Sequence, residues 1–327
     1  MLTAVTGGSG HIGGNLVRAL LERGRSVRCL VRNDRRALEG LDVEMVEGDV
    51  FDMDSLIKLF TGARTVFHLA GRISIAGAEG GLVEKTNIEG VKNIVEACLE
   101  CRVKRLVHFS SIHAFSTYPD DQVVDETRAL ATGKRHFTYD RSKAMGQLAV
   151  LEGVKRGLDA VIVNPGGVIG PNDFKVSRMG EVLLDIYHYR MSALIDGGYN
   201  WVDARDVAEG ALAAEENGRT GEYYLLTGHW VHICDLSALV GKITGKETPQ
   251  GAIPIWLAGI ASYFNLFWSK LRGRTPKFTP IAMKSVMMHR YISHQKATDE
   301  LGYNPRPFEE TVRDTLEWFK GAGMLEV

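Results

Sequence analysis

A tyrosine and a lysine stand four residues apart in "HFTYDRSKAMGQ", residues 136–147 of the chain. Residues at this spacing share one face of a helix, so Tyr139 and Lys143 are expected to be neighbours there. A free phenol titrates near about pH 10, and a nearby cation makes it easier to deprotonate. The pair is therefore either two solvated polar side chains or one acid–base device, and the rest of the chain decides between them.

Three glycines near the start of the chain have a G-x-x-G-x-x-G spacing, at Gly7, Gly10 and Gly13 of "VTGGSGHIGGNLVRALLERG". They lie between an apolar strand pattern and an amphipathic helix pattern. Glycine permits a tight turn at this place and lets backbone N–H groups approach a pyrophosphate. Because of its position between a strand and a helix, the triplet predicts dinucleotide binding.

The end of the second predicted strand bears on the choice between NAD and NADP. An NAD-selective site usually has an acidic residue there to bind the ribose 2′-hydroxyl, and this chain has Val31 followed by Arg32. An arginine can pair with a 2′-phosphate and stack on adenine. We therefore expect NADP(H), with NAD(H) still possible because Asp34 is close by. Asp49 and Val50 follow the third strand and are expected near the adenine.

Short apolar runs alternate with amphipathic stretches through the first half of the chain. This rhythm indicates parallel strands joined by right-handed crossovers, which is a doubly wound α/β sheet. The strand patterns cover residues 2–7, 26–32, 43–49, 65–71, 105–111 and 159–166, and the helix patterns cover 11–23, 52–61, 82–101 and 138–156.

The rhythm changes after about residue 170, at the turn cluster "GPND". We expect a dinucleotide-binding domain over 1–170, to which later segments at about 200–230 return. Residues 171–327 are then mainly a smaller, discontinuous substrate-binding part, with a closing helix over 307–323. The aromatic stretch 253–274 is either a pocket or interface helix or a surface helix that touches a membrane through 255–268.

Bulk composition excludes several classes of protein. The 327 residues carry a formal net charge of −1, which gives no reason to expect nucleic acid as a partner. The apolar run "LTAV" directly after Met1 leaves no room for a signal peptide, and the four cysteines suit reduced thiols. The expectation is a cytoplasmic protein that uses no metal.

Several ordered motifs together resemble the extended short-chain dehydrogenase/reductase family, the NAD(P)-dependent epimerase/dehydratase group. They are T-G-x-x-G-x-x-G at 6–13, "HLAG" at 68–71, "TNIEGVKNIVEA" at 86–97, "FSS" at 109–111, Tyr139-x-x-x-Lys143, "NPGGVIGP" at 164–171 and "WVDARDVAEG" at 201–210. The resemblance covers nearly the whole chain and implies a Rossmann-type fold. The pattern is closest to the dihydroflavonol reductase and 3β-hydroxysteroid dehydrogenase-like branch.

The resemblance implies a role for each residue of the opening pair. Tyr139 is the proton donor and acceptor, and Lys143 binds the nicotinamide ribose and lowers the pKa of the phenol. Ser111 holds the substrate oxygen. Ser110 is its neighbouring candidate, and counting back from Phe115, where the family has an aromatic residue, selects Ser111.

The resemblance also implies a set of cofactor contacts and an assembly. The assembly is a homodimer in which the helices near 82–101 and 138–156 form a four-helix bundle. The expected cofactor-binding residues are Gly7, Gly10, His11, Ile12, Gly13, Arg32, Asp49, Val50, Leu69, Ala70, Gly71, Asn87, Ser110, Tyr139, Lys143, Pro165, Gly166 and Val168.

Two departures from the family pattern bear on the chemistry. Sugar-nucleotide dehydratases have an Asp-Glu pair where this chain has Ile112 and His113, so dehydration is not expected. Sugar-nucleotide enzymes also tend to place a cation for the diphosphate where this chain has Asn200 and Trp201. Arg205 follows closely and could partly replace that cation.

The sequence thus predicts an NADP(H)-dependent oxidoreductase that acts on a carbonyl or alcohol of a moderately apolar small molecule. Two alternatives stay open: a sugar or nucleotide-sugar epimerase, and a non-catalytic cofactor-binding protein. Candidate substrate contacts are His113 and Trp201, with Tyr187, Tyr189, Tyr199 and the 255–268 stretch as further pocket-wall candidates.

Overall fold

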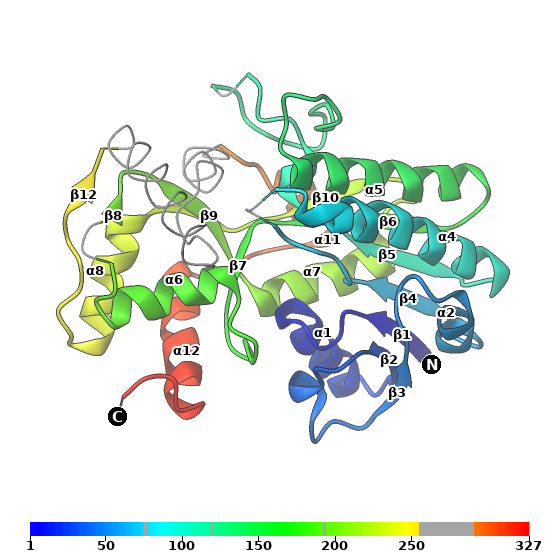
Figure 1. Cartoon of the computed structure of the whole chain (residues 1–327), viewed down its shortest axis with the longest axis horizontal. Helices are drawn as coiled ribbons and strands as arrows, with labels where there is room; N and C mark the ends of the chain where they lie inside the picture. The colour runs from blue at the N-terminus through cyan, green and yellow to red at the C-terminus, as the bar shows by residue number, and fades with distance from the viewer. Residues whose placement is uncertain (75–76, 120, 192–193, 255–290, 327) are drawn as a thin grey trace.

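A seven-stranded, wholly parallel sheet organises the molecule (Figure 1). The computed structural model describes residues 1–327 apart from 75–76, 120, 192–193, 255–290 and 327. The strand order is β3-β2-β1-β4-β5-β6-β10, so the order reverses beside β1. In such sheets ligands bind outside the carboxyl ends of the strands, near this reversal. The predicted doubly wound α/β fold is confirmed.

The first six strands of this sheet agree with the predicted patterns to within a few residues, and β10 is the seventh. They are β1 (Leu2–Thr6), β2 (Ser26–Val31), β3 (Val43–Glu47), β4 (Thr65–His68), β5 (Arg105–Phe109), β6 (Ala160–Pro165) and β10 (Tyr223–Leu226).

Helices cover both faces of the sheet. One face carries α1 (His11–Glu22) and α7 (Ala204–Asn217), and the other carries α2 (Met53–Phe60), α4 (Gly90–Glu100) and α5 (Thr138–Lys155). The strands are apolar on both sides, so a separate core forms under each layer of helices. Leu16 and Leu20 of α1 are fully buried in the first core, and Ile94 of α4 is fully buried in the second.

The predicted helix 82–101 is not uniform. It consists of α3 (Leu82–Glu84), a π-helical turn over Lys85–Glu89 and α4. A π turn widens the backbone, and such turns are frequent at functional sites. Here it carries Asn87, one of the expected cofactor contacts.

A smaller sheet and several helices lie beyond the carboxyl end of the main sheet. Figure 1 shows them on the left of the molecule, with α12 descending toward the C-terminus. The strand order is β11-β9-β7 in this sheet, and β12 pairs with β8 separately. The elements are β7 (Gly167–Ile169), α6 (Arg178–Tyr187), β8 (Leu194–Ile195), β9 (Gly198–Asp203), β11 (His229–His232), α8 (Ile233–Thr244), β12 (Ala252–Ile253) and α12 (Phe308–Gly321).

Two late segments pack back onto the main sheet. Strand β10 pairs with β6, and α11 (Gln295–Leu301) packs against α7 and β10. The aromatic stretch 255–268 lies outside the described residues. None of the helices in the described part of the chain is both long and apolar enough to cross a bilayer.

Candidate active site

Tyr139 and Lys143 lie on the first two turns of α5, where the helix meets the carboxyl end of β5. Lys143 is buried, and its Nζ donates a hydrogen bond to the carbonyl oxygen of Phe109 across 3.1 Å. Burial disfavours the charged ammonium and lowers the pKa of Lys143 to about 8. The carbonyl oxygen at the end of β5 thus holds Lys143 at the carboxyl edge of the sheet.

Ser110 and Ser111, which follow β5, face different partners. The hydroxyl of Ser110 accepts a hydrogen bond of 2.7 Å from Nε2 of Gln147. Ser111 begins the short 3₁₀ helix η4 (Ile112–Ala114), and its side chain is hydrogen-bonded to the Tyr139 phenol. The structure therefore brings Ser111, and not Ser110, to Tyr139.

The phenol of Tyr139 keeps its proton at neutral pH. Burial raises the pKa of Tyr139 to about 12, the Ser111 hydrogen bond opposes this shift, and the charge of Asp140 adds to it. The phenol and the serine hydroxyl can each donate one hydrogen bond to a single carbonyl oxygen. This is the arrangement that proton transfer to a carbonyl needs.

The glycine triplet forms a narrow turn between β1 and α1. A Cβ at Gly13 would lie 2.1 Å from the carbonyl oxygen of Gly7, and a Cβ at Gly7 would lie 2.6 Å from the Ala70 nitrogen. Gly7 also has a φ of +76°, which other L-residues rarely adopt. Only glycine fits both positions, and the space left open is a backbone cradle at a helix N-terminus. The residues present fit a dinucleotide pyrophosphate.

The charges after β2 differ in how firmly they are paired. Arg36 makes a two-point contact with Asp34, at 3.0 and 2.8 Å, and this pair lowers the pKa of Asp34 to about 2. Arg32 is 77% exposed and contacts Asp49 only at 3.4 Å. Arg32 is therefore a loosely held cation at this end of the sheet. Asp34, in contrast, is already paired with Arg36.

Asn87, on the π-helical turn, holds the loop after β4. Its Oδ1 accepts from the Arg72 backbone N–H at 2.8 Å, and its Nδ2 donates to the Arg72 carbonyl and to Ser142 Oγ, both at 2.9 Å. A Cβ at Gly71 would lie 3.3 Å from both Asn87 Oδ1 and Lys143 Nζ. Asn87 therefore shapes this loop beside Lys143.

The other expected cofactor residues lie around the same edge. His11 bridges α1 to the turn after β7, through Nε2 and the carbonyl oxygens of Gly170 and Pro171, each at 3.1 Å. The remaining positions are at strand ends or at the start of α1; they are Ile12, Leu69, Ala70, Pro165, Gly166 and Val168 in addition to Val50.

The prediction that Trp201 contacts the substrate is wrong, because the residue is buried. Its side chain has no exposed surface, its indole N–H donates to the Val231 carbonyl at 3.3 Å, and its ring packs against Tyr199 and Phe308. It is a core residue of the small-sheet region, because alternate residues of β9 face that core. Of the other pocket-wall candidates, Tyr187 is also buried.

Arg205, the candidate substitute for a diphosphate cation, is held by two carboxylates. It pairs with Asp203 at 2.7 and 3.0 Å and with Asp314 at 2.7 Å. Asp203 also caps α7 by accepting from the Arg205 backbone N–H. Arg205 therefore ties α7 to α12 and is not placed as a free cation for a ligand.

One neighbour of Tyr139, the residue Asp140, was missed by sequence reasoning. Asp140 directly follows Tyr139, is buried, and lies 3.3 Å from Nδ1 of His113. His113 was proposed only as a substrate contact, and its ring in fact packs edge-on against the Tyr139 ring. The adjacency of Asp140 to Tyr139 was the available signal, but nothing in the spacing indicates its partner.

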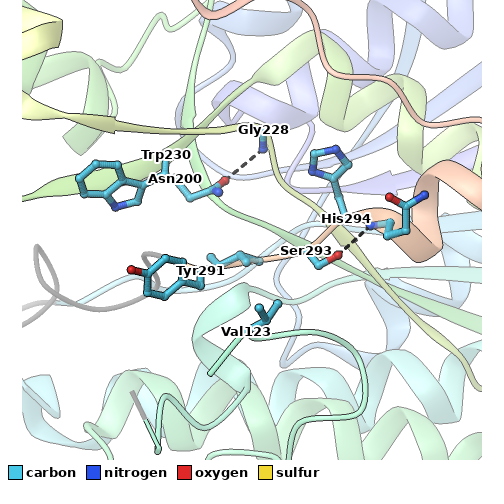
Figure 2. Close-up of a pocket in the computed structure, with 9 residues that line it drawn as sticks. Val123, Asn200, Gly228, Trp230, Tyr291, Ser293 and His294 are labelled. Atoms are coloured by element: carbon cyan, nitrogen blue, oxygen red, sulfur yellow. Dashed lines mark hydrogen bonds between the residues drawn. The ribbon is translucent and has the colours of Figure 1, made fainter. Parts of the chain in front are cut away.

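A hollow of about 460 Å³ opens near the carboxyl end of the sheet (Figure 2). Figure 2 shows Asn200, Gly228 and Trp230 on one side, Tyr291, Ser293 and His294 on another, and Val123 opposite them. Asn200 lies close to Gly166, since a Cβ at Gly166 would be 2.9 Å from its carbonyl oxygen. The hollow therefore adjoins the loop after β6.

The chain is similar to known proteins over nearly its whole length. The model of the NAD dependent epimerase/dehydratase family matches residues 3–226. The chain is 33% identical to sterol demethylase protein B of Methylococcus capsulatus, over 99% of this chain and 100% of that protein. It is 32% identical to a putative dihydroflavonol 4-reductase of Synechocystis, over 98% of this chain and 95% of that protein. The crystal structure of gox2253 is similar over 99% of both chains, with 32% identity and a TM-score of 0.86.

The fold and the similar proteins define an NAD(P)-dependent enzyme of the extended short-chain dehydrogenase/reductase type. The chain belongs to the NAD dependent epimerase/dehydratase family. The family resemblance expected from the ordered motifs is confirmed.

Proposed function

We propose that this protein is an NADP(H)-dependent oxidoreductase that reduces a ketone, or oxidises the corresponding alcohol, on a moderately apolar small molecule. The observation that carries the proposal is the meeting of Ser111, Tyr139 and Lys143 at the end of β5. A bound nicotinamide supplies or accepts the hydride. The hydroxyls of Ser111 and Tyr139 hold the substrate oxygen, and Tyr139 transfers the proton to or from it.

Lys143 supports this role through its charge. Below about pH 8 its buried ammonium is protonated. The family resemblance assigns to this cation the stabilisation of the phenolate that forms when Tyr139 gives up its proton. The carbonyl oxygen of Phe109 fixes the ammonium in place. The residues thus supply position and electrostatic stabilisation for the proton transfer.

Three observations support an apolar substrate. Arg205 is paired with Asp203 and Asp314, so it is not offered to a diphosphate. The hollow beside the loop after β6 is lined by Trp230, Tyr291 and Val123 together with a few polar groups, so aromatic and apolar side chains are available at this end of the sheet. Two relatives carry names that refer to a sterol and to a dihydroflavonol, which are ring compounds without a diphosphate.

The preference for NADP(H) rests on Arg32. It follows β2, it is exposed, and its contact with Asp49 is long, so it is able to turn toward a 2′-phosphate. The acid nearest to the expected ribose position, Asp34, is bound to Arg36. The charge balance at this end of the sheet therefore favours an extra phosphate.

The proposal also includes a division of labour between two parts of the chain, a homodimer and a cytoplasmic location. Residues 1–170 with 200–230 would bind the dinucleotide, and the rest of 171–327 would bind the substrate. On α5, the side chains of Met145 and Leu148 are 40% and 39% exposed. An apolar helix face of this kind suits the proposed four-helix contact between two copies.

The test is a side-by-side titration of NADPH and NADH on the wild type, Arg32→Ala and the control Arg36→Ala. We expect tighter NADPH binding that weakens about tenfold or more in Arg32→Ala only, as loss of a charged hydrogen-bonding pair predicts. A panel of ketones and alcohols with NADPH then tests turnover. Equal or better NADH binding would refute the cofactor choice, and turnover of nucleotide sugars alone would refute the substrate class.

A further inference from the structure

Ser111 and Tyr139 lie on separate elements, although both must face the same substrate oxygen. Ser111 begins η4 after β5, and Tyr139 lies in the first turn of α5. A small misplacement of either hydroxyl is costly, because about 1 Å of error can reduce a rate about a hundredfold. The two hydroxyls therefore need a contact that fixes η4 against α5 at this point.

The side chains of His113 and Asp140 make that contact. Nδ1 of His113 lies 3.3 Å from Oδ1 of Asp140, and the two side chains are 29% and 7% exposed. A buried carboxylate is costly without a partner, so the pairing favours one orientation of the imidazole. His113 is two residues beyond Ser111 and Asp140 is one residue beyond Tyr139, so the pair joins the two elements beside both hydroxyls.

His113 also contacts Ser111 and Tyr139 directly. Its backbone N–H donates to Ser111 Oγ at 3.3 Å. Because Oγ accepts this bond, the hydroxyl hydrogen of Ser111 can be donated to another acceptor. Its ring packs edge-on against the phenol, with ring centroids 5.6 Å apart and ring planes at 63°. One residue therefore touches both members of the hydroxyl pair.

We propose that His113 is a positioning residue: its imidazole, anchored by Asp140, holds the Ser111 turn against Tyr139 so that both hydroxyls face one substrate oxygen. The inference rests on the roles proposed above for Ser111 and Tyr139. The contact that matters is the one between the imidazole Nδ1 and the Asp140 carboxylate, and a side-chain amide nitrogen can take the place of Nδ1. The carboxylate supplies an acceptor oxygen, which an amide also supplies.

The alternative role for the pair is electrostatic, and it predicts the opposite sign for one variant. The charge of Asp140 raises the pKa of Tyr139, so removing that charge alone should ease ionisation of the phenol and speed alcohol oxidation. If the pair positions the hydroxyls, Asp140→Ala slows the reaction despite the lost charge. Asp140→Asn keeps the acceptor and stays close to the wild type.

The experiment compares His113→Ala, His113→Asn, Asp140→Ala and Asp140→Asn in the full-length protein. We expect the alanine variants to lower kcat about 10- to 100-fold while KM and the Kd of NADPH stay within about threefold. The asparagine variants should recover kcat to within about threefold of the wild type. Asp196→Ala is the control, because Asp196 and His232 form a similar pair, 3.0 Å apart, next to β11.

Two kinetic outcomes would overturn the proposal. Wild-type kcat in both alanine variants would show that the pair positions nothing. Equal losses in the alanine and asparagine variants would show that the imidazole acts by transferring a proton instead of by holding a contact. Thermal unfolding of each variant separates these outcomes from a failure to fold.

A third measurement does not depend on turnover. Long-range ¹H–¹⁵N spectra of the histidine rings, without cofactor, should show the proton of His113 on Nδ1 in the wild type and a changed signal in Asp140→Ala. An unchanged His113 signal would refute the pair. If the spectra show the pair but no ketone or alcohol is turned over, the proposed function is refuted while the contact between His113 and Asp140 is confirmed.

Discussion

The rings of His68 and His108 stack on each other between neighbouring strands of the sheet, with centroids 5.3 Å apart and ring planes at 22°. They are register partners on β4 and β5, and both are buried. Burial, with the Lys143 ammonium nearby, lowers the pKa of His68 to about 3 and that of His108 well below its usual value. Two neutral imidazoles therefore lie beneath the lysine of the site, and the Thr6 hydroxyl shares a hydrogen bond of 2.6 Å with Nδ1 of His68.

This pair predicts a loss of stability in acid. An unfolded histidine gains a proton near about pH 6.5, whereas His68 stays neutral down to about pH 3. The unfolded state therefore binds more protons in this window, so the free energy of unfolding falls as the pH falls from 6.5 toward 3. In His68→Gln we expect a shallower fall, by up to about 1.4 kcal/mol per pH unit. Urea unfolding between pH 4 and 7.5 measures both slopes, and parallel curves would contradict the assignment.

Removing the phenol hydroxyl should stop the chemistry and leave cofactor binding in place. Tyr139→Phe keeps the ring contact with His113 but loses the group that transfers the proton, so kcat should fall about 10²- to 10⁴-fold. The Kd of NADPH should change less than about threefold, because the hydroxyl is assigned to the substrate oxygen. Tyr189→Phe, at a tyrosine that is 51% exposed, is the control. A Tyr139→Phe enzyme with near-normal kcat would remove Tyr139 from the mechanism.

The glycine turn should not accept a methyl group. In Gly13→Ala the new Cβ would collide with the carbonyl oxygen of Gly7, so the turn must open and its backbone N–H groups must move. We expect a loss of about 1–3 kcal/mol of stability and at least a tenfold weaker binding of NADPH. Gly321→Ala is the control, since a Cβ there has no neighbour within 4 Å. Calorimetric binding and thermal unfolding report the two effects, and wild-type NADPH affinity in Gly13→Ala would exclude the cradle.

Arg205 should matter for stability and not for ligands. Asp203 has no exposed side-chain surface, so Arg205→Gln leaves a buried carboxylate with weaker pairing, mainly to Arg306 at 3.6 Å. We expect a loss of about 1–3 kcal/mol in the free energy of unfolding, with kcat and the Kd of NADPH unchanged. Denaturant unfolding tests the first part. If the variant instead loses affinity for a diphosphate ligand at unchanged stability, Arg205 binds ligands after all.

Most of the sheet could be predicted from the sequence because its signals are local. Each strand is a short apolar run, and the alternation of strands with helices indicates that consecutive strands are parallel and joined by right-handed crossovers. The Gly7–Gly13 spacing and the Tyr139–Lys143 spacing are local too, since a helix turn and a loop turn fix which of these residues meet. The π turn over Lys85–Glu89 was missed because its composition is that of an ordinary helix.

The tertiary structure decided the partners of the charged and polar side chains. Arg205 could be read as a free cation until Asp314, more than a hundred residues later, was found beside it. Trp201 could be read as a pocket wall until the packing of β9 against α12 buried it. His113 acquired Asp140, and His68 acquired His108, only when separate elements were brought together.

The physical reason for this division is the range of the interactions. Backbone geometry and hydrophobic periodicity act over a few residues, so the sequence by itself determined the sheet, the cradle and the Tyr139–Lys143 face. Burial, ion pairing and pKa depend on neighbours that only the folded chain supplies. The sequence therefore predicted the candidate site residues, and the tertiary structure decided which charged and polar side chains are paired with others.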